Sequence, residues 1–149
     1  MLKGTRTKIG KKIDEIEIGE RVHLVETIED KDLLLYLGLT NDNNPLYIQH
    51  EYAKETVFKK PIVPPIMLNG IVTSAVSKLL PGPGSHIREQ NLKYLQPVYH
   101  YETIEVLLEV EHIDYENQLV TIQVNGVNQN HQLVMQGMLK VLPPSGNAN

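Results

Sequence analysis

The chain has 149 residues, of which 41% are hydrophobic and 21% charged, and its formal net charge is −4. This size suits a single domain, and an acidic balance excludes the basic footprint of a nucleic-acid-binding protein. The absence of cysteine excludes disulfides and thiolate metal sites, and no apolar run reaches the roughly 18 residues that cross a membrane. We therefore expect a cytoplasmic protein that has neither nucleic acid nor a membrane as its partner.

The first half of the chain predicts one strand followed by short helices. Residues 14–28 alternate apolar and polar side chains, which is typical of a strand. Residues 29–40 place acids in a first turn ahead of leucines, which favours a helix because its N-terminus attracts negative charge. The turn formers of "NDNNP" (41–45) end that helix. A second short helical segment is expected within 46–58, from about His50.

The second half predicts one long helix and then four antiparallel strands. Residues 66–80 are apolar on nearly every side, which indicates a buried helix. Pro64 and Pro65 suit the start of that helix, because a first-turn residue has no use for its N–H. Segments with partial alternation follow, separated by turns, at 86–98, 102–114, 118–129 and 132–142.

The order of these elements predicts the fold class and the number of domains. It is an α+β arrangement, in which an antiparallel sheet wraps around one long central helix. This order matches the hotdog fold. No internal repeat and no long linker divides the chain, so 1–149 are expected to form one domain, with loose termini at about 1–12 and 143–149.

Four stretches of the sequence carry a resemblance to a known family. They are "TNDNNPLY…EYA", "FKKPIVPPIML", "LLPGPGS" and "LKYLQPVYHYETI". The first is similar to a Gly-Asp-x-Asn-Pro-aliphatic-His signature, and the second to Pro-Ile-Val-His-Gly-Met-Leu at the start of a central helix. Together they resemble the MaoC-like dehydratases, and among these the (R)-specific enoyl-CoA hydratases. The resemblance extends from about Ile16 to Leu142.

The resemblance implies a reaction and an assembly. In the family, an Asp and a His activate a water, which adds to the β-carbon of a trans-2-enoyl thioester to give the (R)-3-hydroxyacyl product. The thioester carbonyl accepts a hydrogen bond from the N–H of the Gly that opens the central helix, where the developing charge needs it. The ligand is an acyl-CoA or acyl carrier thioester, and no cofactor takes part. Family members are dimers whose site lies between the protomers.

Carried over by position, the resemblance assigns roles to five residues. Asp42 stands at the catalytic aspartate, Asn44 at the Asn of the signature and Thr73 at a supporting hydroxyl. Tyr47 occupies the histidine position, and Pro65 occupies that of the glycine. A phenol, with an ordinary pKa near 10, is a poor base at neutral pH compared with an imidazole, at about 6.5. Proline has no N–H to donate.

Both departures leave other groups as candidates for the lost roles. Asp42 and Tyr47 are expected to divide the work, with the carboxylate as base and the phenol orienting water or acting as acid. Ile66 supplies the next N–H at the helix start. Asn69 lies one turn along the same helical stripe as Pro65, so its amide is a candidate donor to the substrate.

Each of these residues also has an ordinary structural interpretation. Asp42 suits an Asx turn, Tyr47 a partly buried aromatic, and Thr73 a hydroxyl that bonds to its own helix. Asn69 needs a hydrogen-bond partner wherever it is buried. The six histidines show no spacing that suggests a metal site.

The sequence thus predicts a homodimer that binds acyl thioesters and is of hydratase or dehydratase type, with weak or altered activity. Three alternatives remain open. The first is a non-catalytic acyl-thioester binding or regulatory module, in which Tyr47 and Pro65 mark the loss of chemistry. A thioesterase, with Asp42 put to another use, is a weaker alternative. The last is a structural subunit of a larger hotdog assembly.

Overall fold

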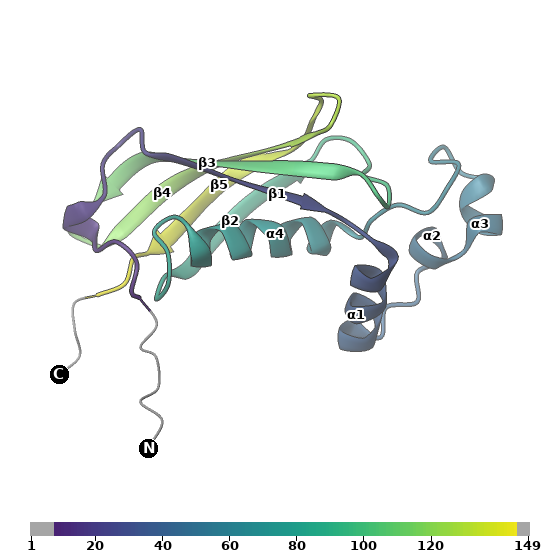
Figure 1. Ribbon diagram of the computed structural model, residues 1–149, viewed down its shortest axis with the longest axis horizontal. Coiled ribbons are helices and arrows are strands. Elements are labelled where there is room, and N and C mark those ends of the chain that lie inside the picture. The colour runs from purple at the N-terminus through teal and green to yellow at the C-terminus, as the bar shows by residue number, and fades with distance from the viewer. Residues whose placement is uncertain (1–7, 146–149) are drawn as a thin grey trace, which may run out of the picture.

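The computed structural model describes residues 8–145. They form a five-stranded antiparallel sheet that curves over one long helix, α4 (Pro65–Lys78) (Figure 1). The strands are β1 (Arg21–Thr27), β2 (His86–Tyr94), β3 (Thr103–Asp114), β4 (Leu119–Asn128) and β5 (Leu133–Leu142). They lie in the order β1-β3-β4-β5-β2, so β1 and β2 are the edges. The predicted α+β arrangement, a sheet wrapped around one helix, is confirmed.

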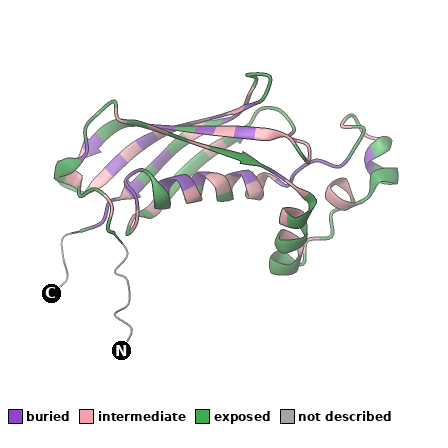
Figure 2. Ribbon diagram, viewed as in Figure 1, coloured by how far each residue is buried: buried purple, intermediate pink, exposed green. Residues whose placement is uncertain are grey.

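The three long strands follow the alternation of their side chains. Inward positions in β3 and β4 are almost fully buried while their neighbours are partly exposed (Figure 2). Among the buried ones are Ile104, Val106, Leu108 and Val110 in β3, and Val120, Ile122 and Val124 in β4. The predicted strands 102–114, 118–129 and 132–142 are confirmed to within one residue. The prediction of 86–98 is too long, since β2 ends before Pro97, which has no N–H for a strand.

Helix α4 is buried along one face only, which corrects the expectation of burial on nearly every side. Its buried residues are Leu68, Val72, Ala75 and Val76, spaced as one helical stripe against the sheet. Ile66 is 52% exposed on the helix itself, and Leu79 just beyond its end is 41% exposed. The sheet of one chain covers one side of the helix, so the apolar residues elsewhere face outward.

The predicted strand 14–28 is also corrected. A short 3-10 helix (Ile13–Glu15) and a turn occupy its first half, and β1 begins at Arg21. Gly19 has a φ of +92°, a left-handed conformation that an extended strand does not contain and that glycine adopts without strain. The alternation of side chains therefore continued across a bend in the chain.

Three short helices project beyond the sheet and form what we call the overhang, residues 29–60 (Figure 1). They are α1 (Asp30–Thr40), α2 (Pro45–Ile48) and α3 (His50–Lys54). Helix α1 matches its prediction and ends at Asn41, whose φ of 56° is left-handed. The helical segment expected from about His50 is confirmed as α3, whereas α2, which the turn formers of the loop start at Pro45, is not among the predicted elements.

Part of the N-terminal arm that was expected to be loose lies among the described residues. Residues 1–7 and 146–149 lie outside the described residues. Within the predicted loose arm, the N–H groups of Gly10 and Lys11 each donate to a carbonyl oxygen of the turn after α4, at 2.8 Å. This described part of the arm is therefore fixed to the body of the fold.

Candidate functional site

Asp42 is held by hydrogen bonds to both of its carboxylate oxygens. The N–H of Asn44 donates to Oδ1 at 3.0 Å, which closes an Asx turn. The hydroxyl of Tyr36 donates to Oδ2 at 2.5 Å. These two donors, Tyr36 first and Asn44 second, hold the pKa of Asp42 below its ordinary value. The carboxylate is thus ionised at neutral pH, and the Asx-turn interpretation of Asp42 is confirmed.

Tyr36 is a residue of this site that sequence reasoning missed. It lies on α1, and its pKa is raised because its hydroxyl donates to the Asp42 carboxylate. Thr40 joins the same unit, since its hydroxyl donates to the Tyr36 carbonyl at 2.8 Å and accepts from the Asp42 N–H at 3.2 Å. The signal was present: a tyrosine one turn before a helix end faces the residues that follow a left-handed Asn41.

Tyr47 lies on the short helix α2, and Asn44, two residues after Asp42, is the N-cap of that helix. The Asn44 Oδ1 accepts the N–H of Leu46 at 3.0 Å and so caps α2, which fixes the direction of the helix. Burial, and secondly the Asp42 carboxylate, raise the pKa of Tyr47, which therefore keeps its proton at neutral pH. The Leu46 carbonyl accepts the N–H of Ile62 at 3.3 Å, which ties α2 to the segment that leads into α4.

Pro65 is the first residue of α4, and Pro64 is its N-cap. The Pro64 carbonyl accepts the N–H of Met67 at 2.9 Å. Ile66 is therefore the first residue of the helix with an N–H, and the N–H groups of a first turn have no acceptor within the helix. A backbone donor is missing at the position that the resemblance gives to the oxyanion glycine, and the nearest one belongs to Ile66.

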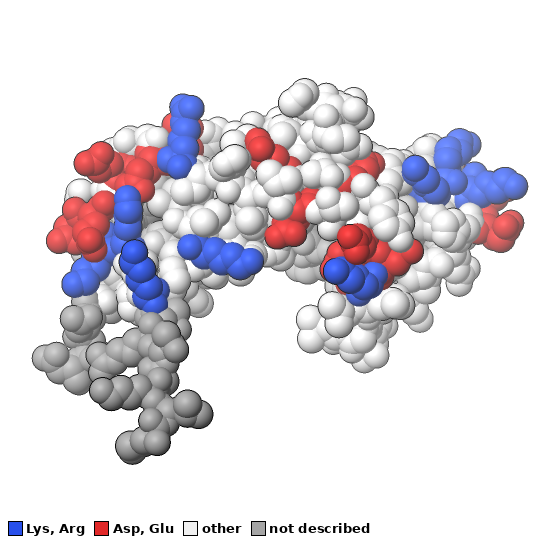
Figure 3. Space-filling view, viewed as in Figure 1, with Lys and Arg blue, Asp and Glu red and all other residues white. Residues whose placement is uncertain are grey.

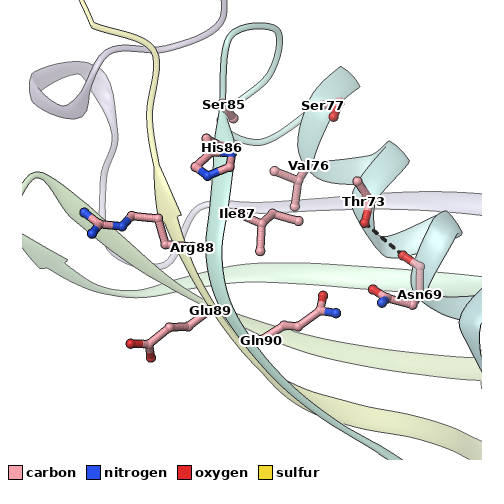
Figure 4. A pocket seen from close by; sticks show the side chains of 10 residues that line it. All are labelled: Asn69, Thr73, Val76, Ser77, Ser85, His86, Ile87, Arg88, Glu89 and Gln90. Atoms are coloured by element: carbon pink, nitrogen blue, oxygen red, sulfur yellow. Dashed lines mark hydrogen bonds between the residues drawn. The ribbon is translucent and has the colours of Figure 1, made fainter.

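Asn69 and Thr73 face a cavity of about 450 Å³ between α4 and β2 (Figure 4). The Thr73 hydroxyl donates to the Asn69 carbonyl at 3.1 Å, as its structural interpretation predicts. The Asn69 Oδ1 is buried and has no hydrogen-bond partner among the described residues. Ser77 and Gln90 also line this cavity. Asn69 therefore presents a free buried oxygen to a polar cavity.

Within one chain, the predicted site residues fall into two groups. Asp42, Asn44 and Tyr47 belong to the overhang, whereas Pro65, Ile66, Asn69 and Thr73 belong to α4. Tyr47 lines a different cavity, also of about 450 Å³, between the overhang and residues 99–101. The hydrogen bond between Ile62 and Leu46 is a direct link between the chain segments that carry the two groups.

The described residues also limit other kinds of site. No helix among them is long and apolar enough to cross a membrane. No group of three or more histidine, aspartate or glutamate side chains in residues 8–145 is arranged to hold a metal ion.

The fold defines the class of protein, and comparison with known proteins gives the family. The arrangement of sheet and helix is the hotdog fold, as predicted, and it is shared with solved (R)-hydratases. The model of the MaoC-like domain matches residues 12–131. The chain therefore belongs to the MaoC-like hydratase and dehydratase family.

The similar proteins include curated enzymes and solved structures. An (R)-specific enoyl-CoA hydratase of Rhodospirillum rubrum is 30% identical over 132 residues, which cover 89% of this chain and 91% of that protein. The unliganded R-hydratase PhaJ1 of Pseudomonas aeruginosa has a TM-score of 0.84 and 26% identity, covering 94% of this chain and 93% of that one. The (R)-hydratase of Aeromonas caviae has a TM-score of 0.82 and 25% identity, covering 87% and 98%.

Proposed function

We propose that this protein adds water to trans-2-enoyl-CoA to form (R)-3-hydroxyacyl-CoA, with weak or altered activity. The observation that carries the proposal is an ionised carboxylate, Asp42, held by Tyr36 and Asn44 beside the protonated phenol of Tyr47. The family and the curated (R)-specific enoyl-CoA hydratase support the class of reaction. Such a role belongs to fatty acid metabolism, and it needs no cofactor besides the thioester.

The proposed mechanism divides the proton transfers between two side chains. The Asp42 carboxylate accepts a proton from a water, and the water oxygen forms a bond to the β-carbon as the double bond opens. The Tyr47 hydroxyl gives its proton to the α-carbon and recovers one from Asp42, so protons balance over the cycle. The raised pKa of Tyr47 keeps its hydroxyl protonated before each turn.

The enolate charge on the thioester oxygen needs a donor that Pro65 does not supply. In this proposal, the Ile66 N–H and the Asn69 side-chain amide take that role at the start of α4, where the helix dipole also favours negative charge. Loss of one oxyanion donor costs roughly 10²–10³ in rate. Turnover well below that of a site with a glycine amide is therefore expected.

The proposed assembly is a homodimer in the cytoplasm, with each site built from two protomers. Two features of the single chain support it. Tyr47 of the overhang and Asn69 of α4 line different cavities, so a second copy would bring new neighbours to each. Strand β2 is an edge of the sheet, and Tyr94 and Leu95 at its end are 40% and 47% exposed.

A non-catalytic acyl-thioester binding module is the second candidate. The paired presence of Tyr47 and Pro65 favours it, because both lack the group that the family reaction uses at their positions. A thioesterase is a weaker alternative, which would use Asp42 against the thioester carbonyl.

One assay separates the three. Crotonyl-CoA is given to the natural protein and to Asp42→Asn, which keeps the Oδ1 acceptor of the Asx turn, and the enoyl absorbance and free CoA are followed. Hydration that Asp42→Asn abolishes supports the hydratase. Saturable binding without turnover supports the module, and release of free CoA supports the thioesterase.

A further inference from the structure

The cavity between the overhang and residues 99–101 has features that the proposed hydration does not use. Its volume is about 450 Å³. Leu33, Leu34 and Leu37 of α1 give it an apolar wall, and His100 lies on the wall opposite. Tyr47 also lines it, so one end of the cavity reaches the proposed catalytic phenol.

His100 is the unexplained group in this cavity. Both of its ring nitrogens are buried, and neither has a hydrogen-bond partner among the described residues. Burial lowers the pKa of His100, which keeps the ring neutral. A neutral imidazole offers one N–H donor and one acceptor nitrogen. Leaving both unpaired in a buried place is unfavourable, so a group that carries both an acceptor and a donor is favoured beside the ring.

The two tyrosines next to His100 in the chain donate their hydroxyl hydrogen bonds to other residues. The Tyr99 hydroxyl donates to the Phe58 carbonyl at 2.8 Å, and the Tyr101 hydroxyl donates to Asp30 Oδ2 at 2.7 Å. These bonds fix the wall on either side of His100 while leaving the imidazole free. The cavity is therefore formed in advance around an unpaired ring.

The lining of the cavity carries charge of both signs, from the Lys60 ammonium and the Asp30 carboxylate. The Lys60 ammonium lies 4.6 Å from the centroid of the Tyr99 ring, and Lys60 lines the cavity together with His50. Figure 3 shows lysine and arginine side chains gathered at the end of the molecule where α3 lies, beside fewer acidic ones. An anionic group is thus favoured beside Lys60 rather than beside Asp30.

The geometry points to a binding site for a phosphopantetheine arm, the flexible chain that CoA and acyl carrier proteins share. This inference rests on the proposed function and adds where the non-reacting part of the substrate binds. Each amide of the arm offers one C=O and one N–H, which match the donor and acceptor of His100. The methyl groups of the arm suit the leucine wall of α1, and its phosphate suits Lys60. The thiol end is then directed toward Tyr47.

The test compares variants of His100 in the full-length protein. Butyryl-CoA, a saturated thioester that cannot be hydrated, is titrated by calorimetry into the natural chain, His100→Leu and His100→Gln. Loss of two hydrogen bonds in His100→Leu is expected to weaken binding by at least about tenfold. The same variant is expected to raise the thermal midpoint, because it removes unpaired buried polar atoms. His100→Gln keeps a donor and an acceptor and is expected to retain binding.

His112→Leu is the matched control, because His112 is exposed on β3. It is expected to leave binding unchanged. Equal affinity in the natural chain and His100→Leu overturns the inference while leaving the proposed function intact. If the natural chain binds no acyl-CoA, the proposed function fails as well. Should His100→Leu not fold, the ring nitrogen resonances of ¹⁵N-labelled His100 decide, since an arm that contacts the imidazole shifts them and unshifted signals overturn the inference.

Two further measurements locate the phosphate and identify its carrier. Lys60→Gln is expected to weaken 4′-phosphopantetheine several-fold and to leave pantetheine, which lacks the phosphate, unchanged. If Lys60→Gln weakens the binding of both molecules equally, Lys60 does not contact the phosphate. The affinities of free CoA and of a holo acyl carrier protein are then compared. The one that binds more tightly identifies the natural source of the arm. Binding of neither overturns the inference.

Discussion

Each of the two carboxylate oxygens of Asp42 accepts a different donor, so this one residue both shapes its loop and carries the charge of the site. Its structural bond to Asn44 comes from the backbone, which substitution at position 44 does not remove. Its second bond comes from the Tyr36 side chain, which can be removed alone. Substitution of Tyr36 is therefore a way to change the pKa of Asp42 without changing the conformation of its loop.

We predict that Tyr36→Phe shifts the pH dependence of hydration. The hydroxyl stabilises the ionised carboxylate and lowers its pKa, so its loss raises the pKa of Asp42 toward the ordinary value. A base with a higher pKa becomes protonated at a higher pH, so the acidic limb of the pH–rate profile moves to higher pH. The initial rate of crotonyl-CoA hydration, measured across the acidic range, checks this shift. An unmoved limb, with Tyr115→Phe as the control at an exposed tyrosine, counts against Asp42 as the base.

We also predict that His100 makes the fold less stable in acid. Burial lowers the folded pKa of His100 below its value in the unfolded chain, so the unfolded chain binds the proton more readily. Stability is then lost as the pH falls through the unfolded value, about 6.5. The thermal midpoint of the natural chain is expected to fall more than that of His100→Gln between about pH 7 and about pH 5. If the thermal midpoints of the two chains fall by the same amount over this pH range, His100 is not a neutral buried imidazole.

At the scale of elements, the local pattern of apolar and polar residues predicts the strands well and the loop regions less well. Strands β3 and β4 agree with prediction because alternate side chains enter one core and their neighbours do not. The first strand was extended too far, since the same alternation crosses the left-handed Gly19.

The site shows a similar limit. Sequence and resemblance propose Asp42 and Tyr47 as site residues, but the bond from Tyr36 to Asp42 depends on how Asn41 turns the chain. The burial of His100 depends on a cavity formed with α1, a helix about 60 residues away in the chain, which no local pattern encodes. Long-range contacts therefore account for the part that the sequence alone did not reveal.

We predict that Leu68→Ala on α4 destabilises the protein by about 2–5 kcal/mol, because it leaves a cavity between the helix and the sheet. Leu68 is 3% exposed and belongs to the buried face of α4. Ile18→Ala is the control, since Ile18 is 66% exposed and is expected to change stability by at most about 0.5 kcal/mol. Urea unfolding measures both, and equal effects would contradict the single buried face of α4.

At the scale of the whole molecule, the separation of the two groups of site residues determines what a dimer must do. If each site combines the overhang of one protomer with α4 of the other, two damaged chains can compensate for each other. The single-chain arrangement, in which Tyr47 and Asn69 line different cavities, is the reason to expect this.

We predict that a mixture of Asp42→Asn and Asn69→Ala, unfolded together and refolded at equal amounts, recovers activity. Random pairing makes half of the dimers mixed, and each mixed dimer has one intact site, so about a quarter of the natural activity is expected. Crotonyl-CoA hydration before and after mixing is the measurement. A mixture no more active than its components would place Asp42 and Asn69 of each site on the same chain.

The tyrosine bonds on either side of His100 have a consequence for local unfolding. Tyr99 and Tyr101 lie in the connection between β2 and β3, and their hydroxyls join it to the two ends of the overhang, at Phe58 and Asp30. The sheet amides are expected to exchange with deuterium slowly and those of α1 and α3 quickly, because the helices have little buried surface of their own. A ligand that fills the cavity would then slow exchange in both helices at once, and the overhang would report occupancy as a single opening unit.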